Sequence, residues 1–166
     1  MLPAAEKPEH TDEYEGFYHL ISMEGEVEKA ILSYIVRDHN ADILKSREDF
    51  MHNTAKFLNE KYGDDVVAVE IKESYRNMDV ILREHWHLIE NARKVVEKLG
   101  GTPVTKPVRG GTDGSRLSFM GLPCPNLGTG SHNAHSRKEF ASAQAMEKVT
   151  QSLVEIAKLY VDFQPD

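Results

Sequence analysis

The sequence is short of several features, and each shortage excludes a class of protein. Its 166 residues include one cysteine, Cys124, so no internal disulfide can form and a reducing cytoplasm is the expected compartment. No run approaches the roughly 18 apolar residues of a membrane helix, and the N-terminus lacks a signal-peptide pattern. The net charge of -7 and the scattered basic residues argue against a nucleic-acid surface. We therefore expect a cytoplasmic protein that binds neither a membrane nor nucleic acid.

The composition that remains is typical of a globular protein of one domain or two small ones, with 40% apolar and 28% charged residues. Two alternating apolar runs, residues 16–23 and 27–39, predict a β-hairpin around a turn at residues 24–26. Asn40 and Asp42 are residue types that begin helices, and Gly63 follows Tyr62, so a helix is expected between them. Residues 66–73 predict a further strand.

The second half of the chain differs from the first in its glycine and proline content and in its apolar pattern. Residues 80–101 predict one helix closed by Gly100 and Gly101. Residues 102–136 are rich in glycine and proline, which predicts short strands joined by tight loops, with a short helix over residues 113–120. A long amphipathic helix is expected from about Ser142. Its apolar face would comprise Met146, Val149, Leu153, Ile156 and Tyr160. A boundary near residue 78 would separate a hairpin–helix–strand unit from a helix–loop–helix unit.

Two histidines, His132 and His135, lie three residues apart in a loop that contains several glycines and serines. A metal site needs three or four convergent ligands, whereas this loop supplies one or two imidazoles. Local sequence alone therefore favours a polar surface loop, with a metal-binding loop as the alternative. His85 and His87 are two residues apart in an expected helix and cannot share a face, so we interpret them as ordinary surface or core residues.

Two arginines could bind an anion. Arg109 precedes a glycine pair, and Thr112 or Asp113 could cap the following helix, whose N-terminus favours negative charge. A structural turn with a solvated arginine fits the same spacing equally well. Arg37 closes an apolar strand, where simple strand termination beside Asp38 is favoured over a side chain that reaches a ligand.

Several motifs then identify a family by their order and spacing. They are PEHTDEYEGFYHL, YIVRDHN, ESYRNM, PVRGGTDGSRLSFMGLPCPNLGTG, HNAH, KEF and MEKV. Together they resemble the C-terminal part of the peptidase T family, the zinc-dependent tripeptide aminopeptidases, over essentially the whole chain. The block from Arg109 to His135 is the most specific portion of the resemblance.

The resemblance implies an α/β (α+β) fold in two parts. In that family a smaller lid domain, a ferredoxin-like sandwich that mediates dimerisation in related enzymes, is inserted into a catalytic α/β domain. Residues 1–78 would form the later part of the lid, as a partial ferredoxin-like hairpin–helix–strand unit. Residues 79–166 would form the C-terminal part of the zinc-peptidase catalytic domain.

The resemblance also assigns roles to single residues. His135 matches the final zinc ligand, Arg37 an arginine associated with the substrate's terminal carboxylate, and Arg109 a substrate-pocket arginine. Asn77 matches the asparagine of the family's NM motif, on the substrate side. The other ligands of the family's two zinc ions and its general-base glutamate are expected before Met1, so no catalytic residue is assigned to this chain.

The chain departs from the family at three positions around His135. Ser131 and Ser136 stand where the family usually has glycine, and Ala134 stands where it has an aromatic residue. We expect the serines to restrict backbone angles that glycine reaches freely, and Ala134 to remove packing that would orient the ligand.

Two functional hypotheses follow. The first is a C-terminal segment of a di-zinc aminopeptidase that removes the N-terminal residue from tripeptides, inactive as an isolated chain because most zinc ligands and the general base lie elsewhere. Its partners would be short peptides and either a second copy of the chain or a complementing N-terminal segment. The alternative is a non-enzymatic oligomerisation or peptide-carboxylate-binding module derived from such a peptidase.

Overall fold

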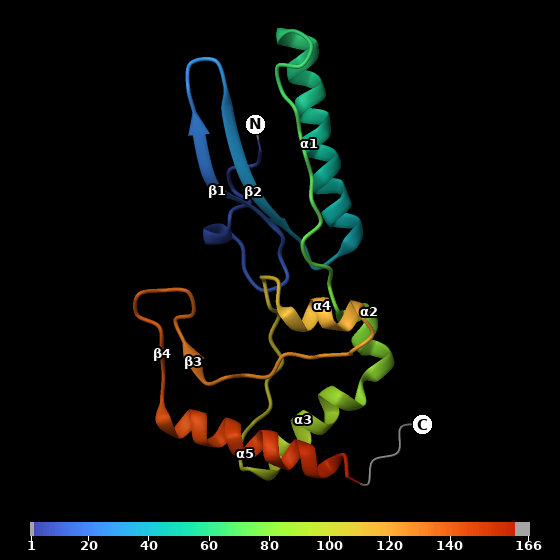
Figure 1. The fold of residues 1–166 in the computed structure, drawn as a ribbon, viewed down its shortest axis with the longest axis vertical. Coiled ribbons are helices and arrows are strands. Elements are labelled where there is room, and N and C mark those ends of the chain that lie inside the picture. The colour runs from blue at the N-terminus through green and yellow to red at the C-terminus, as the bar shows by residue number, and fades with distance from the viewer. Residues whose placement is uncertain (1, 162–166) are drawn as a thin grey trace. The chain divides into compact units, whose positions relative to one another are not determined.

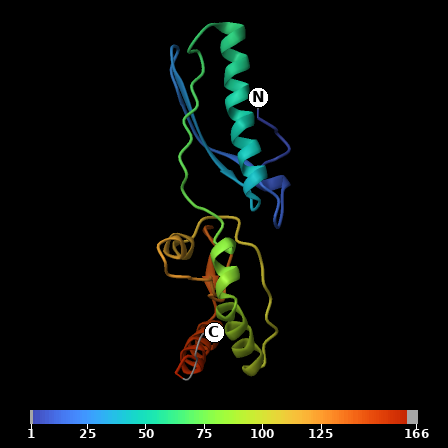
Figure 2. The same ribbon diagram turned by 90° about the vertical axis from the view of Figure 1, so that its right-hand side faces the viewer.

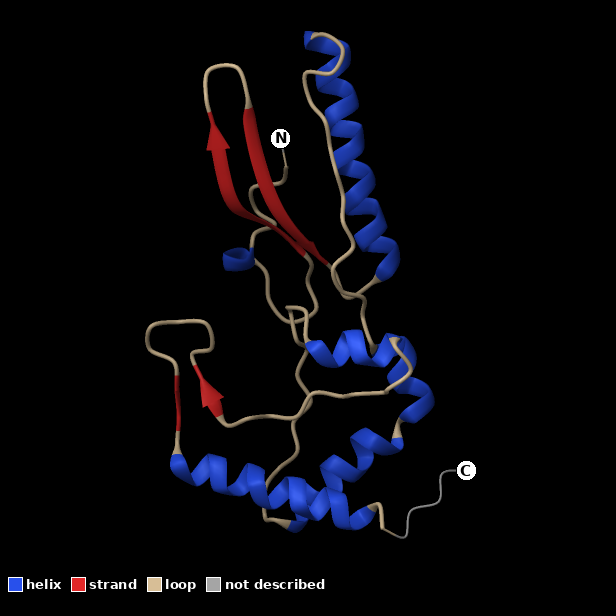
Figure 3. Cartoon of the chain, in the orientation of Figure 1, coloured by secondary structure: helices blue, strands red, loops and turns tan. Residues whose placement is uncertain are grey.

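The computed structural model describes residues 2–161, and these fold as two compact units (Figure 1). The first unit comprises the chain up to Asn77 together with residues 106–111, and the second comprises residues 78–105 and the chain from Thr112 onward. Helices and small antiparallel sheets make this a mixed α/β structure, as the sequence predicts (Figure 3). Within residues 2–161 the helices are all too short or too polar to cross a lipid bilayer.

The first unit begins with a short 3-10 turn, η1 (Pro8–His10), followed by the predicted hairpin. Strand β1 (Phe17–Gly25) pairs antiparallel with β2 (Ala30–Arg37), and a register shift interrupts the ladder between Leu20 and Ser22. The turn lies between Gly25 and Ala30, later than the predicted residues 24–26. It is closed by the backbone N–H of Glu26, which donates to the carbonyl of Lys29 at 2.8 Å.

Helix α1 (Ala41–Tyr62) follows β2 directly and confirms the predicted helix. The Asn40 side chain caps it by accepting the backbone N–H groups of Asp42 and Ile43 at 2.8 and 3.2 Å. Gly63 ends the helix at a φ of 120°, an angle that L-residues rarely adopt. The small core of this unit contains Phe17, Tyr18 and Ala55.

The prediction of a strand at residues 66–73 is wrong, because this segment is not part of a hydrogen-bonded sheet. The segment runs extended along α1 (Figure 1), but no other strand of residues 2–161 pairs with it. Its backbone is held at one point, where the Asn59 side chain donates to the Val67 carbonyl at 2.9 Å and accepts the Val67 N–H at 2.7 Å. A strand-forming sequence therefore lacks the neighbour that would make it a strand.

In the second unit the single helix predicted over residues 80–101 is wrong, because it is divided in three. Helix α2 (Asp79–Leu82) passes through a 3-10 turn, η2 (Arg83–His85), and α3 (His87–Lys98) starts after Trp86. Histidine and tryptophan have modest helix propensity, and three such residues follow one another here. The predicted end is confirmed, since Gly100 has a φ of 76° and Gly101 donates to the Val96 carbonyl at 2.9 Å.

Two further helices begin where the sequence predicts. Thr112 caps α4 (Asp113–Phe119), and Ser142 caps α5 (Ala143–Leu159). Between them the predicted series of short strands is mostly wrong. The described structure has only β3 (Ser131–His132) and β4 (Phe140–Ala141), which form a small hairpin. The other glycine- and proline-rich segments form irregular loops.

Within the second unit α5 packs on α3 and α2 packs on α4. Val95 of α3 is only 1% exposed. On α5 the predicted apolar face is half right, since Val149, Ile156 and Tyr160 are half-buried whereas Met146 and Leu153 are exposed. At the edge of the contact Lys98 and Lys158 both donate to the Glu155 carboxylate, and these bonds lower the pKa of Glu155 to about 2.

Candidate functional site

The first candidate site lies at the open end of the hairpin formed by β1 and β2, where Phe17 and Arg37 are cross-strand partners. Partners in an antiparallel ladder have side chains on the same face of the sheet. The guanidinium carbon of Arg109 lies 5.0 Å from the centre of the Phe17 ring. Arg109 therefore lies over the ring of Phe17, whose cross-strand partner is Arg37. We call Phe17, Arg37, Tyr75 and Arg109 the hairpin-base cluster.

Arg37 makes neutral contacts in this cluster. Its Nη1 atom donates to the Ser74 hydroxyl at 3.2 Å and to the Val36 carbonyl at 3.4 Å. Its guanidinium carbon lies 5.6 Å from the centre of the Tyr75 ring. No carboxylate among residues 2–161 forms an ion pair with Arg37. The guanidinium is therefore a half-buried cation that retains N–H donors for an anionic ligand.

Arg109 is tied into the fold and is not the solvated arginine that the spacing also allowed. Its Nη1 donates to the Thr11 carbonyl at 2.6 Å, and its Nη2 donates to the Thr11 hydroxyl at 2.5 Å and to the Glu15 carbonyl at 3.4 Å. The Nε atom is buried and has no hydrogen-bond partner in the described structure. Arg109 thus fixes residues 11–15 against Phe17 and leaves one buried donor unsatisfied.

Of the two glycines after Arg109, only Gly111 is needed to leave room for a neighbouring side chain. A Cβ atom built on Gly111 would lie 2.0 Å from Cδ2 of the Tyr75 ring, whereas one on Gly110 would meet nothing within 4 Å. Tyr75 also carries the Arg37 guanidinium over its ring. Gly111 therefore allows Tyr75 to take the position in which it contacts Arg37.

Asn77 lies at the same end of the first unit, with a structural hydrogen bond. Its Nδ2 donates to the His39 carbonyl at 3.0 Å. His39 in turn packs edge-on against Tyr14, at a ring-centre distance of 5.0 Å. Asn77 thus ties the chain just after the Tyr75 segment to the turn that follows Arg37.

A second arginine network in this unit was missed by the sequence reasoning. Nε of Arg47 lies 3.0 Å from Oδ2 of Asp38, whose side chain is only 5% exposed, and Nη1 of Arg47 binds Glu6. Burial acts to lower the pKa of Arg47, but the hydrogen bonds to Glu6 and Asp38 outweigh it and raise that pKa. The guanidinium also lies 5.2 Å from the centre of the Tyr18 ring, and burial raises the pKa of Tyr18.

One signal could have revealed this network. Arg47 falls at helical spacing between Leu44 and Met51 on the half-buried face of α1, where a charged residue needs a partner. The pairing also explains Asp38. Its carboxylate serves Arg47 and caps the N–H of Asn40 at 2.9 Å, so Asp38 does not neutralise Arg37.

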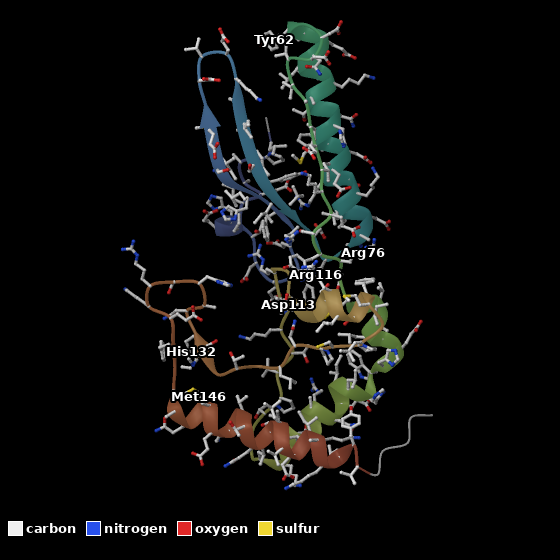
Figure 4. The ribbon with its side chains drawn as sticks, in the orientation of Figure 1. Tyr62, Arg76, Asp113, Arg116, His132 and Met146 are labelled. Atoms are coloured by element: carbon white, nitrogen blue, oxygen red, sulfur yellow. The ribbon has the colours of Figure 1, made fainter. Side chains whose placement is uncertain are left out.

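The second candidate site is the hairpin of β3 and β4, which carries His132 in its first strand (Figure 4). His135 lies in the connection between the two strands. His132 stacks on Phe140 across the pair, with ring centres 5.0 Å apart and an interplanar angle of 23°. His135 is exposed and sits at a φ of 63°, and its backbone N–H donates to the Glu139 carboxylate at 3.0 Å. The two histidines therefore differ, because His132 packs against a neighbour while the His135 imidazole faces solvent.

The two serines of this loop do not occupy its left-handed positions. The residues at positive φ are Asn133 and His135, at 55° and 63°, and neither Ser131 nor Ser136 is among them. Ser136 instead supports the turn, since its hydroxyl accepts the Lys138 N–H at 3.1 Å. The backbone angles of this loop therefore require no glycine at the serine positions.

The described residues do not by themselves fit a zinc ion. A protein-bound zinc takes three or four nitrogen, sulfur or oxygen ligands. Within residues 2–161 no group of three or more His, Cys, Asp or Glu side chains is placed to hold a metal. His135 offers a single accessible imidazole, so any zinc bound there needs ligands from outside the described part of the chain.

Comparison with known proteins agrees with the sequence motifs. The model of the family described as Peptidase family M20/M25/M40 matches residues 7–159. Similar proteins include Peptidase T of Caldanaerobacter subterraneus subsp. tengcongensis, 45% identical over 160 residues, and Peptidase T of Halothermothrix orenii, 46% identical over 160 residues. In both comparisons the match covers 96% of this chain and 39% of the relative.

Peptidase T of Desulfitobacterium hafniense is 47% identical over 161 residues, which are 97% of this chain and again 39% of the relative. The chain thus spans about two fifths of the length of the curated relatives it matches, which confirms the partial resemblance inferred from the motifs. Because the family model extends through both structural units, from before β1 to the last turn of α5, the whole described chain belongs to peptidase family M20/M25/M40.

Proposed function

We propose that this chain is the C-terminal segment of a zinc-dependent tripeptide aminopeptidase and that it supplies the site for the peptide's free carboxylate. The observation that carries the proposal is the hairpin-base cluster, in which Arg109 lies over the ring of Phe17 and Arg37 is the cross-strand partner of Phe17. A peptide carboxylate is planar and anionic, and guanidinium groups bind such groups through paired N–H donors. In this proposal residues 1–78 act as the later part of the lid and residues 79–166 as part of the catalytic domain.

The two arginines take different roles. Arg37 has no ion-pair partner among residues 2–161, so its charge is available to a ligand, and we assign it the contact with the carboxylate. The Nη atoms of Arg109 are already committed to Thr11, and only its Nε lacks a partner. Arg109 therefore holds the cluster together and adds at most two donors, the Nε–H and the second N–H of Nη1. Asn77 is a positioning residue, because its amide bonds the His39 backbone close to Arg37.

His135 would contribute one imidazole to a metal site whose other ligands come from outside the described residues. Its exposure and its place at the tip of a hairpin allow a second polypeptide segment to approach it. With one such ligand the chain has no means of activating water, since two-metal sites need ligands for both ions. We therefore propose that the isolated chain is inactive and retains no stoichiometric zinc.

Calorimetric titration of the chain with a tripeptide and with the same tripeptide amidated at its C-terminus tests the carboxylate site. We expect the free acid to bind and the amide to bind at least about tenfold more weakly, because the charge-assisted hydrogen bonds are lost. Arg37→Ala should abolish the preference, whereas Arg93→Ala, which removes an exposed arginine bonded to Thr105 at 3.0 Å, should leave it unchanged. Equal binding of acid and amide would refute the assignment.

The alternative function, a non-enzymatic oligomerisation module in the cytoplasm, is favoured by one specific observation. Ile43, Phe50 and Phe57 recur at seven-residue spacing along α1, and their side chains are 48%, 42% and 59% exposed. Such an apolar stripe on a helix surface is typical of a contact with another chain. Light scattering at increasing concentration tests it. A stable dimer dispersed by Phe50→Ser with Phe57→Ser would support the module, and a monomer throughout would exclude it.

A further inference from the structure

The hairpin of β3 and β4 has a fixed base. Strand β4 leads directly into α5, so the connection between the two strands lies at the end of the hairpin away from that helix (Figure 1, Figure 2). At the base Gly130 has a φ of 74°, and a Cβ atom built on it would lie 2.5 Å from Cβ of Ala145 in α5. Because the base packs this closely against the helix, the direction of a side chain in the connection depends on the geometry of the connection itself.

The connection, residues 133–139, begins with a turn in which His135 takes a position that favours glycine. Ser136 donates its backbone N–H to the Asn133 carbonyl at 3.1 Å, so His135 is the third of four turn residues. Its φ is 63°, whereas Ala134 is not among the residues with positive φ. This combination is that of a type II turn, whose third residue is usually glycine or asparagine. A histidine there needs an interaction that keeps the turn in this form.

Glu139 supplies that interaction. The central peptide of the turn joins Ala134 to His135, and its N–H donates to Oε2 of Glu139 at 3.0 Å. A type I turn differs from a type II turn chiefly by turning this peptide over, which would point the N–H away from Glu139. Among residues 2–161 Glu139 forms no ion pair that would draw its carboxylate away from this backbone group.

The other side-chain hydrogen bonds of the connection act on its second half. Nδ2 of Asn133 donates to the Lys138 carbonyl at 3.2 Å, and the Ser136 hydroxyl accepts the Lys138 N–H at 3.1 Å. Neither bond reaches the central peptide of the turn. Within residues 2–161 the orientation of that peptide is therefore held by the side chain of Glu139.

We infer that Glu139 is a positioning residue, which sets the direction of the His135 imidazole by holding the turn in its type II form. A change of φ from positive to negative rotates the Cα–Cβ bond of His135 about its N–Cα bond, so the imidazole would leave the direction that it has here. The inference rests on the proposed function, which makes this imidazole a metal ligand, and it adds the residue that presents the ligand.

Nuclear magnetic resonance of the full chain tests the inference without a metal. Positive φ brings an amide hydrogen close to its own Hα, so His135 should show a strong nuclear Overhauser effect between these two atoms. Glu139→Ala should abolish this signal and speed the exchange of the His135 amide at least about tenfold, since the amide loses its acceptor. Glu139→Gln keeps an acceptor oxygen and should restore both properties. Residual dipolar couplings of the His135 Cα–Hα bond, referred to α5, measure the change of direction.

Ser136→Ala is the matched control. It removes one hydrogen bond from the same connection, the bond to the Lys138 N–H, and leaves the Glu139 bond in place. We expect His135 in this variant to keep its strong signal, its dipolar coupling and its slow exchange. An effect equal to that of Glu139→Ala would show that Glu139 only stabilises the loop in general, and would overturn the positioning role. Amides of α5 serve as the internal reference for folding.

The outcomes distinguish this inference from the proposed function. An unchanged signal and dipolar coupling in Glu139→Ala would overturn the positioning role and leave the assignments of His135 and of the carboxylate site untouched. Failure of Glu139→Gln to restore what Glu139→Ala loses would overturn it as well, because a hydrogen-bond acceptor would then not be sufficient. Equal binding of the peptide acid and the peptide amide would instead refute the proposed function, without altering the geometry measured at His135.

Discussion

The hairpin-base cluster and the His135 loop were both identified by the same family resemblance, yet they differ in how they are built. At the hairpin base, Arg109 makes three hydrogen bonds and lies over the Phe17 ring. Gly111, which has no Cβ atom, leaves room there for the Tyr75 ring. At the loop, the His135 side chain is exposed and its backbone is held at a left-handed angle. One site is assembled within its unit, while the other presents a single group outward.

The difference teaches where each site obtains its partners. In the proposed function, a guanidinium held by neutral contacts needs only the ligand to complete its charge balance, so the hairpin base would bind a peptide without another polypeptide. A lone imidazole cannot hold a metal, so the metal site proposed at this loop would need ligands from elsewhere. We therefore expect substitutions at the hairpin base to change stability and peptide binding in the isolated chain, and substitutions at the loop to matter only in a complex.

The largest expected effect is at the network that supports the hairpin base. Arg47→Ala leaves the Asp38 carboxylate, 5% exposed, without its buried partner and should lower the free energy of unfolding by about 3 kcal/mol. Urea denaturation followed by circular dichroism measures this loss. Lys45→Ala is the control, since Lys45 and Asp49 are 65% and 51% exposed and their pair should contribute less than about 0.5 kcal/mol. Equal losses in both variants would contradict the buried network.

The next effect distinguishes the two glycines after Arg109. Gly111→Ala places a methyl group in the Tyr75 ring position and should cost about 2 kcal/mol, while weakening peptide binding through Arg37. Gly110→Ala adds its methyl group to open space and should be tolerated within about 0.5 kcal/mol. Thermal denaturation and peptide titration of the two variants measure both effects, and similar behaviour of the two would argue against the packing role of Gly111.

The second unit should respond to acid through Glu155. Its pKa is lowered to about 2 by Lys158 and Lys98, so the folded state favours the ionised form. The resulting stabilisation is fully present above the ordinary carboxyl pKa of about 4.5 and is lost as the pH falls through about 2. Fluorescence of Trp86, the only tryptophan, should report loosening of this unit over that range. Glu155→Gln should lack this contribution at neutral pH, and an identical acid transition in this variant would contradict it.

The smallest effect is expected at His135. Because its φ is 63°, His135→Gly relieves a left-handed angle, and the free energy of unfolding should rise or stay constant within about 1 kcal/mol. His135→Val should be less stable, since a β-branched side chain disfavours that angle. Chemical denaturation of the two variants measures the difference, and a large loss in His135→Gly would show that the imidazole supports the fold.

The sequence predicted the elements whose signals are local. The hairpin, α1 with its Asn40 cap, the ends at Gly63 and Gly100, and the starts of α4 and α5 depend on neighbouring residues and were confirmed. Residues 66–73 have the composition of a strand, but a strand also needs a partner, which no local pattern supplies. The helix break at Trp86 was missed because apolar periodicity continues through it.

The candidate sites were predictable only in part, for a related reason. The resemblance named Arg37, Asn77, Arg109 and His135, but the pairing of Arg37 with Phe17, the residue whose ring Arg109 covers, is a property of strand register. The Arg47 network joins residues from three separate segments, so only the charge on a half-buried helix face hinted at it. The roles of the four named residues remain predictions.

One measurement tests the central proposal, that this chain supplies part of a peptidase site and that the rest of the site comes from outside residues 1–166. The chain, the unmatched part of Caldanaerobacter subterraneus subsp. tengcongensis Peptidase T, and their mixture are each assayed for tripeptide hydrolysis with zinc, alongside a mixture made with His135→Ala. The account predicts no hydrolysis by either part alone, hydrolysis by the mixture, and at least about a hundredfold loss in the variant, as for a metal-site residue. Zinc-dependent hydrolysis by the purified chain alone, abolished by His135→Ala, would contradict it.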